Sequence, residues 1–210
     1  MNQHHDVIVV GGGAIGCSTA YFLRSEGLKV ALVDKGEVGK EASWASAGII
    51  GPVSLPEGDP WFLQATNLSK QLYDELNSKL FEQTGLWMGY GGQGTMILAL
   101  SEEEAEAAKI QAKQGIAAGL QIEILMGAEA RRCESVLPDN LMAAILYPQS
   151  RFLDARNYTA TIAKAAQDKG VTIRQGWPVT AMVWQGKQVV GVRSGPNQLL
   201  ADWVINAAGT

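Results

Sequence analysis

The chain has 210 residues, of which 47% are apolar and 18% charged, and its formal net charge is −4. This composition is typical of a globular protein with a sizeable core, and the absence of a basic cluster argues against nucleic acid as a partner. No apolar run is long enough to span a membrane and residues 1–5 lack the layout of a signal peptide, so we expect a cytoplasmic protein.

The first predicted element is a β-branched strand at residues 7–10, followed by a glycine-rich turn. Gly11, Gly13 and Gly16 match the G-x-G-x-x-G fingerprint of dinucleotide-binding units. In that fingerprint the first glycine allows a tight turn and the second lets the backbone approach a pyrophosphate. The third lets the following helix, which we expect to end at Gly27, pack on the strand. The alternative is the same β–α–β unit without a ligand.

A second strand is predicted at residues 29–33, and it delivers Asp34 at its carboxyl end. A carboxylate at this position can accept both hydroxyls of an adenosine ribose and would repel a 2′-phosphate. Cys17 falls inside the first helix and Cys133 is the only other cysteine, so we interpret both as inert thiols. His4 and His5 are expected to be exposed in a tail before the first strand.

Residues 39–52 are rich in Gly, Ala and Ser, which are needed where backbone lies close to a flat ligand. Ser43 could offer its hydroxyl to a pyrophosphate, and the turn at residues 47–49 could border a ring system. A tightly packed helix–helix contact would favour the same small residues. The residues alone leave these two interpretations open.

Together, the glycine turn and residues 39–52 resemble the amino-terminal part of the D-amino-acid-oxidase-type flavoproteins, and most of all the glycine oxidases of thiamine synthesis. The resemblance implies FAD as the cofactor. It places Ala14 and Ile15 at the pyrophosphate, Asp34 and Lys35 at the adenosine ribose, Ala42 and Ser43 at the phosphates, and Ala47, Gly48 and Ile49 beside the flavin. Family members often have a second hydroxyl residue where this chain has Ala42.

Further elements follow in chain order. An apolar stripe at steps of three and four predicts a helix with a buried face at residues 61–80, and residues 86–100 suggest two strands around Gly91 and Gly92. Ser101 and Glu104 form a capping box for a helix to about residue 118, whose first-turn glutamates should be solvated. A short helix at 126–133 and a strand at 142–147 complete this part.

Asp154 is expected to cap a helix over residues 155–168, with Gly170 as its stop. A strand at 171–174 precedes a three-stranded meander, predicted at residues 179–184, 189–193 and 199–206. Such a meander is frequent in flavoproteins with two dinucleotide-binding segments. There the backbone at Val179 would face the adenine, and the turn of Ala207, Ala208 and Gly209 would return to the FAD.

The fold class expected is α/β: a Rossmann-like FAD-binding domain with a parallel sheet and a meander crossover, plus part of an α+β substrate domain. We expect the FAD-binding domain at residues 1–84 and 149–210 and the substrate domain at 85–148. Members of the family continue with an arginine for the substrate carboxylate and a last FAD segment. The resemblance therefore implies that this chain is an amino-terminal part of the enzyme. We expect this part to be inactive by itself.

By resemblance, the reaction is hydride transfer from the Cα of a small, glycine-like amino acid or secondary amine to the flavin N5. The resulting imine then gives a 2-oxo acid. No residue earns a catalytic role and no metal site is expected, although Ile49 and residues 90–94 are candidates for lining the substrate site. The chain could form a homo-oligomer. One alternative is a non-catalytic dinucleotide-binding remnant. A nicotinamide-linked dehydrogenase is a weaker alternative, because residues 42–48 argue against it.

Overall fold

The computed structural model describes residues 4–51 and 60–209, which divide into two compact units. The first unit comprises Met1–Gly48, Asn77–Gly89 and Asp154–Thr210, and the second comprises Ile49–Leu76 and Tyr90–Leu153. The expected domain limits were residues 1–84 and 149–210 against 85–148. The two units differ from them chiefly because Ile49–Leu76 groups with the second unit.

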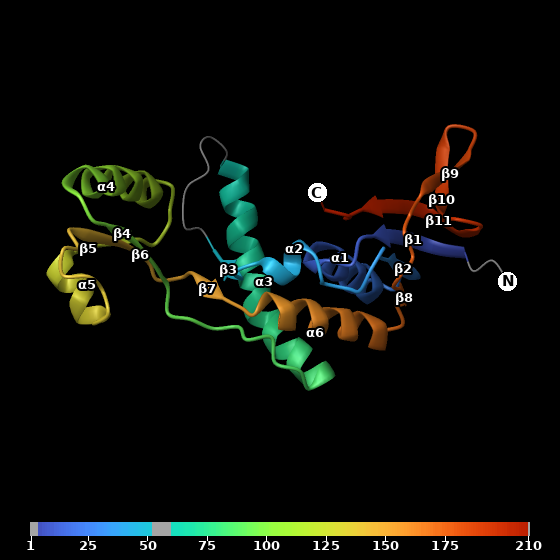
Figure 1. Cartoon of the computed structure of the whole chain (residues 1–210), viewed down its shortest axis with the longest axis horizontal. Helices are drawn as coiled ribbons and strands as arrows, with labels where there is room; N and C mark the ends of the chain where they lie inside the picture. Colours follow the sequence, from blue (N-terminus) through green and yellow to red (C-terminus); the bar gives the residue numbers. More distant parts are fainter. Residues whose placement is uncertain (1–3, 52–59, 210) are drawn as a thin grey trace. The chain divides into compact units, whose positions relative to one another are not determined.

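A six-stranded sheet forms the first unit, in the order β8-β2-β1-β11-β10-β9 (Figure 1). The first four strands of this order are parallel, and β11, β10 and β9 form the antiparallel meander. The mixed sheet confirms the expected α/β class. The strands are β1 (His4–Val10), β2 (Val30–Val33), β8 (Thr172–Arg174), β9 (Ala181–Gln185), β10 (Gln188–Ser194) and β11 (Asn197–Asn206).

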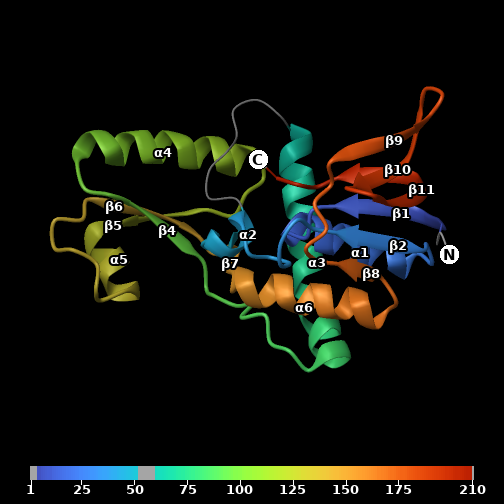
Figure 2. The same ribbon diagram turned by 45° about the vertical axis from the view of Figure 1, so that its right-hand side comes forward.

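Two helices of the first unit lie side by side (Figure 2). They are α1 (Ala14–Ser25), which packs on both strands, and α6 (Ala155–Asp168), which packs on α1. Ile8 and Val9 of β1 point to opposite faces of the sheet, and both are fully buried. The apolar run at residues 7–10 therefore reflects a strand covered on both faces.

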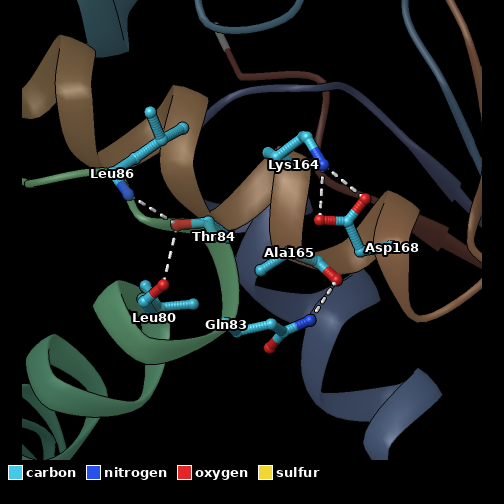
Figure 3. A network of polar contacts seen from close by, with 7 residues as sticks. All are labelled: Leu80, Gln83, Thr84, Leu86, Lys164, Ala165 and Asp168. Atoms are coloured by element: carbon cyan, nitrogen blue, oxygen red, sulfur yellow. Dashed lines mark hydrogen bonds and ion pairs between the residues drawn. The ribbon is translucent and has the colours of Figure 1, made fainter.

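The end of α3 (Pro60–Thr84) is tied to α6 by one amide (Figure 3). Gln83 donates a hydrogen bond from Nε2 to the carbonyl oxygen of Ala165, over 2.9 Å. Thr84 closes the helix, because its hydroxyl donates to the carbonyl of Leu80 and accepts from the N–H of Leu86. These bonds hold the last turn of α3 within the first unit.

The apolar stripe of α3 was predicted to be buried, and this is wrong for its first half. Leu76 and Leu80 are 5% and 0% exposed, whereas Phe62, Leu68 and Leu72 are 45%, 61% and 52% exposed. Periodicity reports which side chains share a face, but only packed neighbours decide whether that face is covered. Within the described residues, no helix is both long and apolar enough to cross a membrane.

The second unit contains a three-stranded antiparallel sheet in the order β4-β6-β5. Its strands are β4 (Thr95–Ala99), β5 (Glu123–Met126) and β6 (Ala143–Tyr147), with the helices α4 (Glu102–Ala117) and α5 (Gly127–Cys133). In the capping box of α4, Ser101 Oγ accepts the N–H of Glu104, whose carboxylate accepts the N–H of Leu100. Separately, β3 (Ile49–Ile50) pairs with β7 (Arg151–Phe152).

Only one of the two strands expected within residues 86–100 forms. The first half is coil with a single bridge between Gly91 and Phe152, and β4 pairs with β6 instead of folding back on this segment. Gly85, Gly89, Gly92 and Gly94 all have positive φ, which breaks an extended run. The short strands β3, β5 and β7 were not predicted.

The expectation of two exposed histidines is wrong for His5. Both belong to β1, where they pair with Leu200 and Ala201 of β11, and the His5 side chain is fully buried. His4 is exposed, and its Nε2 lies 3.4 Å from a carboxylate oxygen of Asp202. The strand begins three residues before the β-branched run because β11 is long enough to pair with these residues.

Asp154 caps the amino terminus of α6 and should stabilise the fold. Asp154 Oδ1 accepts hydrogen bonds from the N–H groups of Arg156 and Asn157, over 2.9 and 3.0 Å. Asp154→Ala should lower the free energy of unfolding by about 1 kcal/mol, measured by equilibrium urea unfolding. Asp154→Asn keeps a capping oxygen and serves as the control. Equal losses in both variants would contradict a capping role.

Candidate functional site

The glycine-rich turn lies where β1 meets α1, and two of its glycines leave no room for side chains. A Cβ at Gly11 would lie 2.2 Å from the carbonyl oxygen of Ala207, and a Cβ at Gly16 would lie 1.8 Å from that of Gly11. Gly11 also has a φ of +107°, which side chains rarely tolerate. These contacts bring the end of β1, the start of α1 and the turn after β11 together.

Gly13, the residue before α1, has space in front of it instead. A Cβ there would contact only the hydroxyl oxygen of Ser43, at 3.1 Å, among the described atoms. Ser43 belongs to the short helix α2 (Ala42–Ala45), and its Oγ accepts the N–H of Ala14 over 2.9 Å. A hydroxyl that accepts one bond retains its own proton to donate. Ser43 can therefore donate to a ligand next to Gly13.

Asp34 follows β2 and joins two backbone segments. Its Oδ2 accepts the N–H of Gly12 over 2.6 Å, and its Oδ1 accepts the N–H of Gly36 over 2.8 Å. An ionised carboxylate has about four acceptor positions, so each oxygen retains capacity for one more donor. The arrangement suits a ligand with two neighbouring hydroxyl groups.

These residues surround a cavity of about 460 Å³ within the first unit. Twelve of the sixteen residues singled out from the sequence line it: Gly11, Gly13, Ala14, Ile15, Asp34, Lys35, Ala42, Ser43, Val179, Ala207, Ala208 and Gly209. They come from the turn after β1, the loop after β2, the start of the meander and the turn after β11. The fold thus brings distant segments together at one cavity. Gly11 and Gly209, for example, are 198 residues apart in the sequence.

The other four candidates lie outside this cavity. Gly16 packs against the turn, as described above, and Ala47 and Gly48 follow α2 without lining the cavity. Ile49 belongs to the second unit, where its side chain is 53% exposed.

Other lining residues were missed by the sequence reasoning, namely Val10, Val33, Glu37, Gly39, Lys40, Glu41, Trp177 and Pro178. Trp177 donates its backbone N–H to the carbonyl of Asp34 over 2.7 Å, which places the segment after β8 beside the acid. Gly39 donates to the carbonyl of Gly12 over 2.9 Å. In the sequence, Gly39 could have been noticed only as a single glycine in a loop. No sequence pattern marks Trp177.

Cys17 is buried in α1, with its Sγ 3.3 Å from the carbonyl oxygen of Gly12. Burial, and to a lesser extent the nearby Asp34 carboxylate, raises the pKa of this thiol to about 12. Cys17 is therefore a neutral thiol at physiological pH, as expected for a packing residue.

The second unit has a cavity of its own, of about 340 Å³. It is lined by Ile49, Ile50, Gly51, Ala65, Thr66, Ser69, Lys70 and Tyr73. Tyr90, a candidate for lining a substrate site, stacks on Tyr73 and donates to Asp74 without lining this cavity itself. Burial and the bond to Asp74 raise the pKa of Tyr90. No group of three His, Cys, Asp or Glu residues within 4–51 and 60–209 could hold a metal ion.

Comparison with known proteins finds several relatives. Glycine oxidase of Pseudomonas putida is 29% identical over 203 residues, which cover 97% of this chain and 54% of that protein. Human mitochondrial sarcosine dehydrogenase is 26% identical, covering 97% and 22% of the two chains. The crystal structure of glycine oxidase from Bacillus cereus superposes with a TM-score of 0.90 and 29% identity, over 98% of this chain and 55% of that one.

The chain thus spans between about a fifth and about half of the length of these relatives. Residues 6–210 match the family model described as FAD dependent oxidoreductase, DAO. Because that match extends over almost the whole sequence, the chain belongs to the DAO family of FAD-dependent oxidoreductases.

Proposed function

We propose that the first unit is the FAD-binding part of an enzyme that oxidises a small, glycine-like amino acid or secondary amine. The second unit would then be part of the substrate domain. The observation that carries the proposal is the cavity in which Gly13, Ser43 and Asp34 meet. The names of the relatives, glycine oxidase and sarcosine dehydrogenase, support the substrate class. A cytoplasmic location is part of the same proposal.

The residues of the cavity fit a dinucleotide. The space in front of Gly13 is one that a side chain would fill, and the Ser43 hydroxyl retains a proton to donate there. Asp34 retains acceptor positions for two ribose hydroxyls after it has bound Gly12 and Gly36. The volume of about 460 Å³ lies within the usual range for small-molecule sites.

The N–H groups at the start of α1 add to this fit, because the positive end of a helix dipole favours a phosphate. By position, Gly13, Ala14 and Ser43 would hold the pyrophosphate. Asp34 would orient the adenosine ribose, and the backbone at Val179 would face the adenine.

When bound, FAD would supply the two-electron oxidation, in which the substrate gives up the hydride of its Cα–H and a proton of its nitrogen, and water would hydrolyse the imine to a 2-oxo acid and ammonia or an amine. The task of this chain is to hold the cofactor in one position, since orientation accounts for much of such catalysis. None of the residues around the cavity needs to act as a catalytic acid or base for that task.

The visible absorption spectrum tests this function. We expect the purified chain, supplied with FAD and freed of excess, to retain flavin absorption bands. Anaerobic glycine and sarcosine are then added. Bleaching of the bands would support amine oxidation, and bands that persist would support the alternative of a non-catalytic FAD-binding part. A protein that stays colourless at every FAD concentration would overturn the proposal.

Gly13→Val should reduce FAD binding below detection, because the new side chain would occupy the space in front of residue 13. Thr19→Val, in the helix that follows Gly13 but away from the cavity, is the matched control and should bind FAD normally. Titration of the chain with FAD, followed by flavin fluorescence, measures both. Retained binding in folded Gly13→Val would place the pyrophosphate elsewhere.

Ser43→Ala should weaken FAD binding roughly tenfold, because it removes a hydrogen bond to a charged phosphate. It also leaves the N–H of Ala14 without its described side-chain partner. Ser43→Thr keeps a hydroxyl and should restore most of the affinity. If alanine and threonine variants bind FAD equally well, the Ser43 hydroxyl does not contact the cofactor.

A further inference from the structure

The charges around the cavity are unfavourable for the ligand proposed above. Three carboxylates line it, those of Asp34, Glu37 and Glu41, against the two lysines Lys35 and Lys40. A pyrophosphate adds further negative charge to this excess of acids. A cation that faces the phosphates would offset this excess of acids and add to the effect of the α1 amino terminus.

The two lysines differ in how they are engaged. Lys35 Nζ lies 3.3 Å from a carboxylate oxygen of Glu41, so its charge is already paired. Lys40 has no carboxylate within ion-pair distance among the described residues. Its ammonium instead lies 3.6 Å from the centre of the Trp44 indole ring. A cation over an aromatic face is attracted without being paired with an anion, so Lys40 can still interact with a phosphate.

Trp44 is itself held in place by Arg156 of α6. The carbonyl of Trp44 accepts a hydrogen bond from Arg156 Nε over 3.1 Å, and the Arg156 guanidinium carbon lies 4.5 Å from the centre of the ring. Arg156 is in the first turn of α6, where Asp154 fixes its backbone N–H. Arg156 thus anchors the indole to α6.

The loop that carries Lys40 is anchored as well. Gly39, with a φ of +78°, donates to the carbonyl of Gly12 over 2.9 Å, and a Cβ there would lie 2.9 Å from Cγ2 of Thr159 in α6. Ser43, whose hydroxyl faces the cavity, directly precedes Trp44 in α2. Lys40 therefore lines the cavity, while Trp44 lies next to it, outside the lining and adjacent to Ser43 in α2.

From this arrangement we infer that Lys40 is the cation that balances the charge of the bound pyrophosphate, and that Trp44 is the residue that positions it. The inference rests on the proposed FAD site. A lysine side chain normally loses much conformational freedom when it binds an anion. The indole restricts the ammonium before the ligand arrives, which reduces that loss. Arg156 holds Trp44 and therefore influences Lys40 only indirectly.

The test compares affinities for FAD, ADP and adenosine, measured by titration of the chain at low and high salt. Lys40→Met should weaken both FAD and ADP roughly tenfold at low salt, with a shallower salt dependence, since surface charge interactions are screened. Adenosine lacks the pyrophosphate and should bind as before. Lys40→Arg keeps the charge and should restore most of the affinity.

Trp44→Leu should weaken FAD and ADP about threefold, the effect of losing one exposed cation–π contact, and Trp44→Phe should lose less. Lys187→Gln is the matched control, because it removes the same charge from the turn between β9 and β10, outside the cavity. Circular dichroism establishes that each variant is folded.

The possible outcomes distinguish a failure of the FAD site from a failure of the role assigned to Lys40. If the unsubstituted chain binds neither FAD nor ADP, the proposed function itself fails. If it binds both, and Lys40→Met binds them with unchanged affinity, the role of Lys40 is overturned while the FAD site stands. An equal loss in Lys40→Met and Lys187→Gln would indicate a general effect of net charge, and would also overturn it. Adenosine affinity that falls with Lys40→Met would place the lysine at the nucleoside instead.

Discussion

The contact on which the first unit depends is the one between bare backbones at the glycine turn. A Cβ at Gly16 would lie 1.8 Å from the carbonyl oxygen of Gly11, and a Cβ at Gly11 would lie 2.2 Å from that of Ala207. No side chain can be accommodated at such distances. The start of α1, the end of β1 and the turn after β11 can therefore meet only because both positions are glycine.

Polar groups then join the loops around that turn. The N–H of Gly12 is bound by Asp34, and the N–H of Ala14 is bound by Ser43. Each side chain satisfies a donor at the end of β1 or the start of α1, where the helix supplies no partner. The loop after β2 and the helix α2 are drawn to the same place as a result. Both side chains also line the cavity, so the residues that join the loops are the same ones that the proposed FAD site would use.

Prediction from sequence succeeded where a residue specifies its own local structure. Asp154 marks the start of α6, Ser101 that of α4, and both helices have the expected limits within one residue. It failed where the outcome depends on distant partners. Leu68 and Leu72 share a helical face with buried leucines but are half exposed, and His5 is buried because β11 pairs alongside it. Residues 86–90 contain strand-forming side chains, yet the partner of β4 is β6.

The same division applies to the site. The spacing of Gly11, Gly13 and Gly16, with Asp34 after the next strand, is enough to predict a dinucleotide-binding unit, because all four residues belong to one β–α–β segment of contiguous chain. Residues 39–52, and the family resemblance that they carry together with the glycine turn, extend this prediction to FAD. Only the tertiary structure decided which further residues lie at the cavity or hold those that do. Trp177, Lys40 and the Arg156 that holds Trp44 come from separate segments. Their proximity results from how the loops pack on α6 and the sheet, and long-range packing leaves no periodic trace in a sequence.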